Sequence, residues 1–313
     1  MTADTRNGSH TPPFGRLLTA MVTPFDEDGA VDYGKAQVLA RSIIEAGGDG
    51  LVITGTTGEA PTLTHDEKAK LYAAVIEVVG KDAAVLAGTS TYNTRESVEA
   101  SVEAEKIGVD GLLLTVPYYN KPSQDGLYRH FESIAAAVDI PCIVYNIPGR
   151  TGINMLPETI ARAGREIPNV IGVKEASGVC EAVATIVEGA GPGFYVWSGD
   201  DSMTLPFMSV GGYGVICTCS NIVARQMRCL IDEFVAGRVL EAGATHRRLL
   251  PIMSILSGST APASNPVPLK HAMNKLGFKV GGVRQPLWDL DETVSQKLMD
   301  VVSRYEVDLP VTV

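Results

Sequence analysis

Short apolar runs rich in β-branched residues recur along the chain, and helical patterns separate them. The runs at residues 112–114 and 143–144 are continuous rather than alternating with polar residues. Continuous runs are typical of parallel strands that are buried on both faces. The pattern predicts eight strands, near residues 17–23, 50–54, 84–89, 111–116, 141–146, 170–175, 194–199 and 214–219.

Helix-start signals stand between these runs. Asp32 precedes apolar residues at helical spacing, and Thr64 followed by Glu67 forms a capping box. Thr94 and Pro157 are the start signals of two further helices. Eight βα units in series predict a (β/α)8 TIM barrel rather than a doubly wound sheet, which would need a glycine-rich turn after its first strand.

The predicted strands end well before the chain does. We divide the chain into a polar N-terminal tail (1–13), the barrel (14–237) and a C-terminal helical extension (238–313). The uncharged segments 202–224 and 249–269 are broken by Pro, Gly, Ser and Asn, so neither should span a membrane. The N-terminus also lacks an apolar secretory segment, and we expect a cytoplasmic protein.

Charge and cysteine content narrow the function classes. The 313 residues include 26 Lys+Arg and 36 Asp+Glu, for a formal net charge of −10. A nucleic-acid-binding protein would need a basic stripe, so we expect no nucleic-acid partner. The five cysteines form no C-x-x-C pair and are expected to be reduced, with Cys217 and Cys219 on one face of the eighth strand.

A TIM barrel carries its active site at the carboxyl ends of the strands. After the second strand, Gly55 and Gly58 bracket Thr56 and Thr57, a loop that could offer N–H and hydroxyl donors to a carboxylate. An ordinary polar turn is the alternative interpretation. Tyr118 and Tyr119 follow the fourth strand.

The fifth and sixth strands supply the strongest chemical signal. Tyr145 ends the fifth strand, and Arg150 follows on a Pro/Gly-shaped loop that could clamp a carboxylate. Strand periodicity places Lys174 on the same face as Gly172, where a lysine would point into the barrel mouth. Such an amine suits Schiff-base chemistry if burial lowers its pKa by about three units, which costs about 4 kcal/mol. Together these residues predict an α-keto acid site.

A metal-dependent alternative finds little support in the sequence. The five histidines are scattered, with no pair at a spacing of two, three or four residues: His10, His65, His130, His246 and His271. Neither a phosphate-binding P-loop nor a nucleophile elbow is present. We therefore predict no metal and no cofactor other than a covalent imine on Lys174.

Five motifs in order resemble the dihydrodipicolinate synthase family of pyruvate-dependent class I aldolases: Gly55-Thr-Thr-Gly-Glu59, Pro117-Tyr-Tyr-Asn-Lys-Pro122, Tyr145-Asn-Ile-Pro-Gly-Arg150, Gly172-Val-Lys-Glu-Ala176 and Ser198-Gly-Asp-Asp201. The resemblance runs from about residue 17 to about residue 287. It implies that Lys174 forms the Schiff base with pyruvate and that Tyr145 transfers protons. It also implies that Thr57 holds the pyruvate carboxylate, and that Thr56 and Tyr119 complete the proton relay.

The same resemblance implies the second substrate and the assembly. Arg150 would bind the carboxylate of L-aspartate 4-semialdehyde, and Ile216 would contact pyruvate through its backbone with Gly199 near the same mouth. Tyr119 would reach into a neighbouring subunit of a homotetramer, a dimer of dimers. The product would enter the diaminopimelate route to lysine.

Two alternatives remain open. One is another aldolase of this fold, an N-acetylneuraminate lyase or a keto-sugar-acid aldolase, although these usually lack the arginine at position 150. The other is a non-catalytic barrel that binds a keto acid, which would tolerate loss of Lys174 or Tyr145; both are present.

The chain departs from the family where lysine would regulate it. Members inhibited by lysine tend to carry a second histidine three residues after the histidine that matches His65. They also tend to carry an asparagine four residues before the glutamate that matches Glu96. Here these positions hold Lys68 and Tyr92. A cationic Lys68 should repel a cationic amino acid, so we predict weak or absent feedback by lysine.

Overall fold

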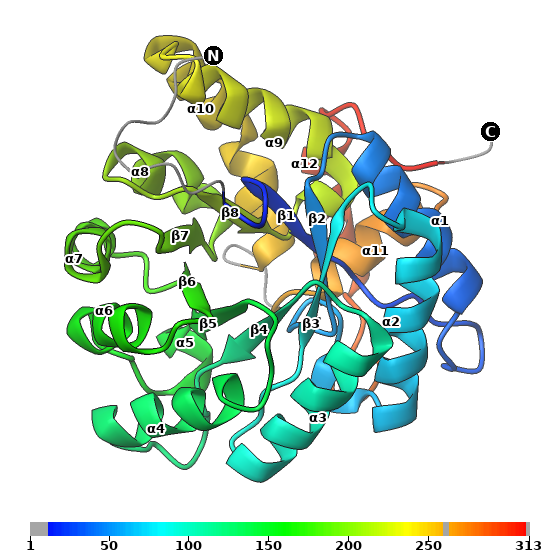
Figure 1. The fold of residues 1–313 in the computed structure, drawn as a ribbon. Helices are drawn as coiled ribbons and strands as arrows, with labels where there is room; N and C mark the ends of the chain where they lie inside the picture. Colours follow the sequence, from blue (N-terminus) through cyan, green and yellow to red (C-terminus); the bar gives the residue numbers. More distant parts are fainter. Residues whose placement is uncertain (1–11, 259–262, 311–313) are drawn as a thin grey trace.

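The eight strands form one closed, parallel barrel in which each strand pairs with the next and β8 closes on β1 (Figure 1). The computed structural model describes residues 12–258 and 263–310. The strands are β1 (Leu17–Ala20), β2 (Gly50–Ile53), β3 (Ala84–Gly88), β4 (Gly111–Thr115), β5 (Cys142–Asn146), β6 (Val170–Glu175), β7 (Tyr195–Ser198) and β8 (Gly214–Cys217). All eight predicted strands and the predicted TIM barrel are confirmed.

Helices cover the outside of the barrel and continue beyond it. They are α1 (Tyr33–Glu45), α2 (His65–Val79), α3 (Thr94–Ile107), α4 (Gln124–Ala135), α5 (Pro148–Thr151), α6 (Pro157–Glu166), α7 (Cys180–Ala190), α8 (Thr204–Ser209), α9 (Ser220–Val235), α10 (Val239–Ser257), α11 (Val267–Lys275) and α12 (Glu292–Val302), with 3-10 turns η1 (Ala60–Thr62) and η2 (Asp201–Met203). The predicted helical C-terminal part is confirmed, because α10, α11 and α12 follow the last strand without a further strand among the described residues.

The strands divide the apolar residues into two cores. One core fills the barrel interior, and the other lies between the strands and the helices. The interior core consists of Phe14, Leu18, Ala20, Val52, Leu86, Leu113, Ile143, Tyr145, Tyr195, Trp197 and Ile216. Both faces of each strand are therefore buried, which accounts for the continuous apolar runs in the sequence.

Two local predictions need correction. Cys219 does not lie on β8, which ends at Cys217; it caps the following helix α9. The two sulfur atoms nevertheless lie 3.5 Å apart. Helix α3 is capped by Asn93 rather than by Thr94, because the Asn93 side chain accepts hydrogen bonds from the first turn. The capping residues Asp32 and Thr64 and the helix start at Pro157 are confirmed.

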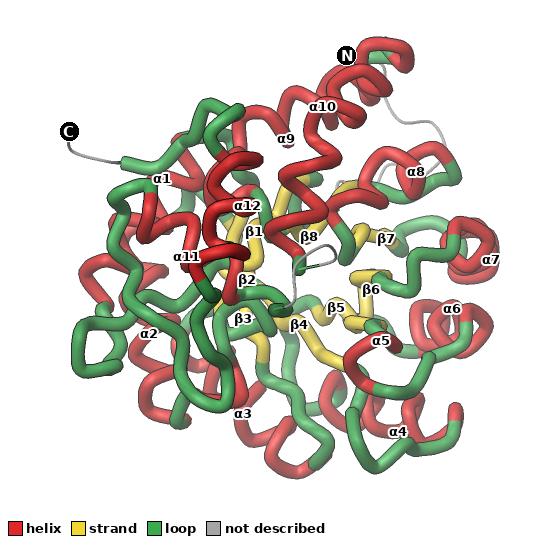
Figure 2. Tube along the Cα trace, turned by 180° about the vertical axis from the view of Figure 1, so that it is seen from behind, coloured by secondary structure: helices red, strands yellow, loops and turns green. Residues whose placement is uncertain are grey.

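The C-terminal helices lie against one side of the barrel. Helix α10 packs on α9 and α12, and α11 packs on both α10 and α12 (Figure 2). Side chains from the α11 region reach residues that follow β1 and β2, so this part lies at the barrel end where the strands finish. None of the helices in the described ranges has the length and apolar character needed to cross a membrane. The boundaries at residues 13 and 237 stay predictions, and residues 1–11 of the tail lie outside the described part.

The barrel interior tolerates no side chain at Gly172. A Cβ atom there would lie 2.3 Å from the Tyr195 carbonyl oxygen and 2.6 Å from the Trp197 ring. The space beneath Lys174 is therefore filled by Trp197 rather than empty.

We expect Gly172→Ala to lower the free energy of unfolding by about 1–3 kcal/mol, because the added methyl group overpacks the interior. Urea unfolding midpoints would measure the loss. Gly282→Ala is the matched control, since a Cβ at Gly282 meets no atom within 4 Å. Equal midpoints for the two variants would contradict this account of the barrel interior.

Candidate active site

Lys174 and Tyr145 face each other across the β5–β6 pair. The two residues are partners in the strand register, and Lys174 Nζ lies 4.3 Å from the centroid of the Tyr145 ring. Only 5% of Lys174 and 4% of Tyr145 is exposed. Strand pairing thus holds an amine and a phenol together in a site that is largely closed to water.

Burial changes the protonation of the amine. It lowers the pKa of Lys174 to about 8, while the negative charge of Asp201 acts in the opposite direction. About one amine in ten is then uncharged at pH 7, against fewer than one in a thousand for a free lysine side chain. The desolvation that the sequence analysis required is therefore present, and Lys174 can act as a nucleophile.

Asp201 is a buried carboxylate whose position is fixed by the backbone. One carboxylate oxygen accepts the Thr218 N–H at 2.9 Å, and the other accepts the Cys219 N–H at 2.7 Å. Its charge raises the pKa of Lys174 and also that of Tyr145. In the sequence Asp201 is visible only as part of a motif, and its electrostatic effect on the amine emerges from the fold.

Tyr145 keeps its proton. Burial raises the pKa of the phenol, and the positive charge of Arg150 and a hydrogen bond with the Thr56 side chain partly oppose that effect. A protonated phenol can donate a proton to a developing alkoxide and take it back later. The link to Thr56 connects Tyr145 with the loop that follows β2.

Gly199 leaves space for the lysine side chain. A Cβ atom at this position would lie 3.1 Å from Lys174 Cγ and 2.8 Å from Ala176 Cβ. The Gly199 N–H donates to the Glu175 carbonyl at 2.7 Å, which holds the glycine beside the end of β6. A larger residue would push Lys174 away from Tyr145 or displace the backbone.

The loop after β2 is held by a residue that the sequence analysis missed. Asn265, which precedes α11, donates from Nδ2 to Thr57 Oγ1 at 2.8 Å. Its backbone carbonyl accepts a hydrogen bond from Arg150 Nη2 at 3.1 Å. Thr57 and Arg150 are thereby joined through one residue that lies more than a hundred positions from either in the sequence. Only that long-range contact reveals Asn265, since nothing in its local sequence marks it.

Of the remaining predicted residues, Tyr119 lies outside this cluster and Ile216 lies in the barrel interior with Tyr145. Tyr119 is 88% exposed and has a positive φ of 72°, an unusual backbone conformation for a tyrosine. The Ile216 side chain lies in the barrel interior, and its backbone pairs with Leu18 of β1. Lys174, Tyr145, Thr56, Thr57, Arg150 and Gly199 therefore share the barrel mouth, whereas Tyr119 points to solvent in the single chain.

The described ranges contain one group of side chains that lie close enough together to hold a metal ion. The ligand atoms of Asp201, Cys217 and Cys219 all lie within 4.8 Å of one another. Both Asp201 oxygens already accept backbone N–H groups, and burial raises the pKa of both thiols. A metal needs deprotonated sulfur ligands, so binding here would have to displace both thiol protons and the backbone bonds of Asp201.

Sequence comparison decides the family. The model of the dihydrodipicolinate synthetase family matches residues 13–305. The chain belongs to this family. The predicted resemblance is therefore confirmed, and the chain is an enzyme of the lyase type.

Individual relatives agree with the family match. A 4-hydroxy-tetrahydrodipicolinate synthase from Symbiobacterium thermophilum is 52% identical over 93% of this chain and 98% of its own length. A dihydrodipicolinate synthase from Bacillus anthracis superposes with a TM-score of 0.90 at 39% identity, covering 93% of this chain and 98% of its own. The enzyme from Cyanidioschyzon merolae, solved with lysine bound, has a TM-score of 0.90 at 41% identity over 94% and 98% of the two chains.

The charge of Asp201 gives a prediction about pH. Removing it should destabilise the Lys174 ammonium and lower the pKa of the amine further. We expect Asp201→Asn to move the acidic limb of the kcat/KM profile toward lower pH by about one unit. Initial rates across the pH range would measure the shift.

Asp200→Asn is the control, because Asp200 does not contribute to the Lys174 pKa shift and hydrogen-bonds Ser202 instead. An acidic limb that stays in place in Asp201→Asn, with the protein folded, would show that Asp201 does not tune the amine.

Proposed function

We propose that the chain condenses pyruvate with L-aspartate 4-semialdehyde to form 4-hydroxy-tetrahydrodipicolinate, through a Schiff base on Lys174. The observation that carries this proposal is the buried Lys174 amine with its lowered pKa beside the protonated Tyr145. The names of relatives at about half identity over nearly the full chain support the same reaction.

The first half of the reaction forms the covalent intermediate. The uncharged Lys174 amine adds to the keto carbon of pyruvate, and the oxygen takes up a proton from Tyr145. The ammonium nitrogen of the adduct returns a proton to the Tyr145 phenolate, and the relay of Tyr145 and Thr56 delivers it to the carbinolamine hydroxyl, which leaves as water and gives the iminium. The Tyr145 phenolate then takes a proton from the pyruvate methyl group, and the resulting enamine attacks the aldehyde carbon of the second substrate, whose oxygen takes that proton up. The amino group of the semialdehyde attacks the iminium carbon and displaces the Lys174 amine, which releases the heterocyclic product.

Thr57 and Arg150 bind the two substrate carboxylates in this proposal. The buried Thr57 hydroxyl lies in the loop that opens toward the mouth and binds the pyruvate carboxylate. The exposed Arg150 on α5 binds the carboxylate of the semialdehyde at the entrance. Ile216 contributes its backbone to the pyruvate site, and Gly199 keeps the mouth open beside Lys174.

Tyr119 completes the relay from a neighbouring subunit. Its exposure and its constrained backbone in the single chain support a role outside its own barrel. We therefore propose a homotetramer, a dimer of dimers, in which each mouth receives Tyr119 of an adjacent chain. The proposed chemistry uses no metal and no organic cofactor, so catalysis should survive prolonged treatment with a chelator.

Borohydride reduction tests the covalent step. With pyruvate present, reduction should add the mass of a reduced pyruvyl group to the peptide that contains Lys174. Lys174→Arg should abolish both the adduct and turnover, because the guanidinium remains charged and cannot form the imine. Peptide mass spectrometry and a coupled assay measure the two effects.

The control is Lys275→Arg, which changes an exposed lysine on α11. Unchanged peptide mass in the wild-type chain would refute the Schiff-base mechanism.

A substrate panel with pyruvate held constant tests the second substrate. Aspartate 4-semialdehyde should react fastest, and faster reaction with N-acetylmannosamine or a sugar-acid aldehyde would refute the proposed specificity.

Regulation gives a separate prediction. Lys68 lines a cavity of about 270 Å³ between α2 and α3, together with His65 and Glu96. Tyr92 stacks edge-on against Tyr118 with ring centroids 5.1 Å apart. Because the Lys68 ammonium repels another cation, we expect millimolar lysine to leave the initial rate unchanged.

Initial rates measured with increasing lysine check this expectation. The double variant Lys68→His with Tyr92→Asn restores the residues typical of inhibited relatives and should gain sensitivity. Half-inhibition of the unmodified chain by millimolar lysine would contradict the prediction.

A further inference from the structure

The segment 265–270 lies outside the barrel sequence but contacts the barrel mouth at three points. Asn265 contacts Thr57 and Arg150, and Lys270 contacts Glu59. We propose that Asn265 and Lys270 are positioning residues, which set the geometry of both substrate-carboxylate sites from the C-terminal helical part. The inference rests on the proposed roles of Thr57 and Arg150 in substrate binding.

Asn265 is placed to orient the hydroxyl of Thr57. Its amide nitrogen can only donate, so the Thr57 oxygen is the acceptor in the 2.8 Å hydrogen bond. The proton of Thr57 is then free for a different acceptor. A substrate carboxylate in the mouth is an acceptor of the right kind, and the donated bond would point the Thr57 O–H toward it.

The other polar atom of the Asn265 amide, Oδ1, contributes no hydrogen bond to the described structure. This atom is buried without a hydrogen-bond partner in the described structure, although only 8% of the residue is exposed. A buried acceptor without a partner destabilises a protein. An asparagine kept purely for stability would satisfy both ends of its amide, as Asn274 on α11 does by bonding Gly281 and Val280.

Lys270 holds the far end of the same loop. Its Nζ atom donates to Glu59 Oε1 at 2.8 Å and to the Thr23 carbonyl at 3.0 Å, and both charged side chains are buried. Glu59 adopts a positive φ of 56°, and its N–H donates to the Thr56 carbonyl. The ion pair therefore fixes the turn that places Thr56 and Thr57.

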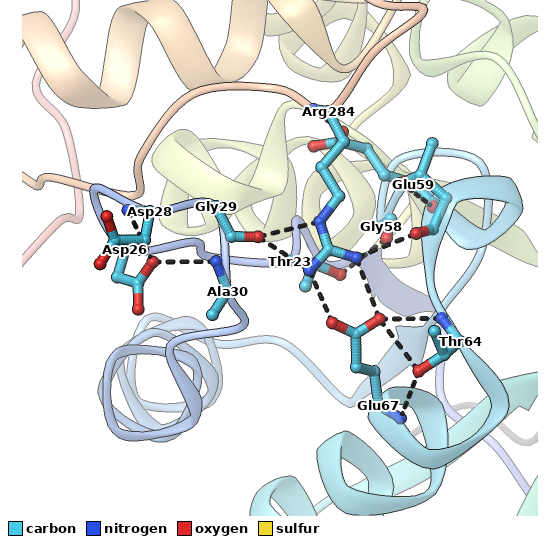
Figure 3. A network of polar contacts seen from close by, with 11 residues as sticks. Thr23, Asp26, Asp28, Gly29, Ala30, Gly58, Glu59, Thr64, Glu67 and Arg284 are labelled. Atoms are coloured by element: carbon cyan, nitrogen blue, oxygen red, sulfur yellow. Dashed lines mark hydrogen bonds and ion pairs between the residues drawn. The ribbon is translucent and has the colours of Figure 1, made fainter.

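A second C-terminal residue reinforces Glu59. The Arg284 N–H donates to Glu59 Oε2 at 2.8 Å, while the Arg284 guanidinium forms a two-pronged ion pair with Glu67. Figure 3 shows Arg284 between Glu59, Glu67 and the Gly29 carbonyl, directly beside the loop. Both oxygens of Glu59 are thus held from the C-terminal part, so the loop has little freedom to move independently of it.

Kinetics of Asn265→Ala test the proposal. We expect KM for pyruvate to rise about tenfold, because Thr57 loses the hydrogen bond from the Asn265 side chain, while kcat changes much less. KM for the semialdehyde should change less, because Arg150 donates to the Asn265 backbone carbonyl, which the substitution leaves in place. The melting temperature should stay close to that of the unmodified chain, because the lost side chain carries an unsatisfied buried oxygen. Asn265→Ser, whose hydroxyl is too short to reach Thr57, is the second variant if the alanine protein does not fold.

Asn274→Ala is the matched control, with the opposite expectation. It removes two satisfied hydrogen bonds of the Asn274 side chain and should lower the melting temperature without raising either KM. An unchanged KM for pyruvate in Asn265→Ala, or the same pattern in both variants, would overturn the positioning role.

A double-mutant cycle tests whether Asn265 acts through Thr57. The double variant Asn265→Ala with Thr57→Val should have the same KM for pyruvate as Thr57→Val alone, and fully multiplicative effects would overturn the proposed coupling. Pyruvate binding by calorimetry provides the same comparison without turnover. Failure of borohydride trapping in the unmodified chain would refute the proposed function, while the calorimetric cycle would still decide the positioning claim.

Discussion

Removal of the Lys174 amine from water is the physical constraint on which the site depends. Burial lowers the pKa of this amine to about 8, and no other effect acting on it is larger. The barrel provides the burial because β5, β6 and β7 surround the side chain, with the Trp197 ring beneath and Gly199 beside it. Asp201 limits the shift, because its negative charge stabilises the Lys174 ammonium, and the same charge would stabilise an iminium formed at this nitrogen.

The chain contains a second buried lysine, and the comparison clarifies what makes the first one reactive. Lys270 lies against the Glu59 carboxylate and the Thr23 carbonyl, which stabilise its charged form and occupy its hydrogen atoms. Both amines lie over aromatic rings, Lys174 over Tyr145 and Lys270 over Phe25, and burial lowers the pKa of both to about 8. Lys174 differs because its ring carries a phenol and no carboxylate is hydrogen-bonded to its amine. A buried lysine that donates to a carboxylate holds structure, whereas a buried lysine next to a phenol that can transfer protons can attack a carbonyl. Burial alone therefore does not identify a nucleophile; the partner does.

Most of the fold was predictable from local sequence. Strand periodicity and helix-capping residues are local signals, and the eight strands, the start of α1 and the capping box of α2 follow from them. The errors arise where two local signals compete. Asn93 rather than Thr94 is the N-cap residue of α3, and Cys219 is the N-cap residue of α9 rather than part of β8.

The barrel mouth was predictable only in part. Lys174, Tyr145, Thr57 and Arg150 end or follow strands, so barrel topology alone places them together. Asn265 and the Lys270–Glu59 pair could not be predicted, because they depend on how a helix some 200 residues away in sequence packs onto the loop after β2. The positive φ of Glu59 likewise becomes visible only in the folded chain.

Titration of the Lys174 amine tests the central claim most directly. In protein carrying lysine labelled with carbon-13 at the ε position, the Lys174 resonance can be assigned by its loss in Lys174→Arg and followed by NMR across the pH range. We expect a titration midpoint of about 8. A midpoint at the value of a free lysine side chain, about 10.4, would show that the amine is not desolvated and would contradict the proposed activation of Lys174.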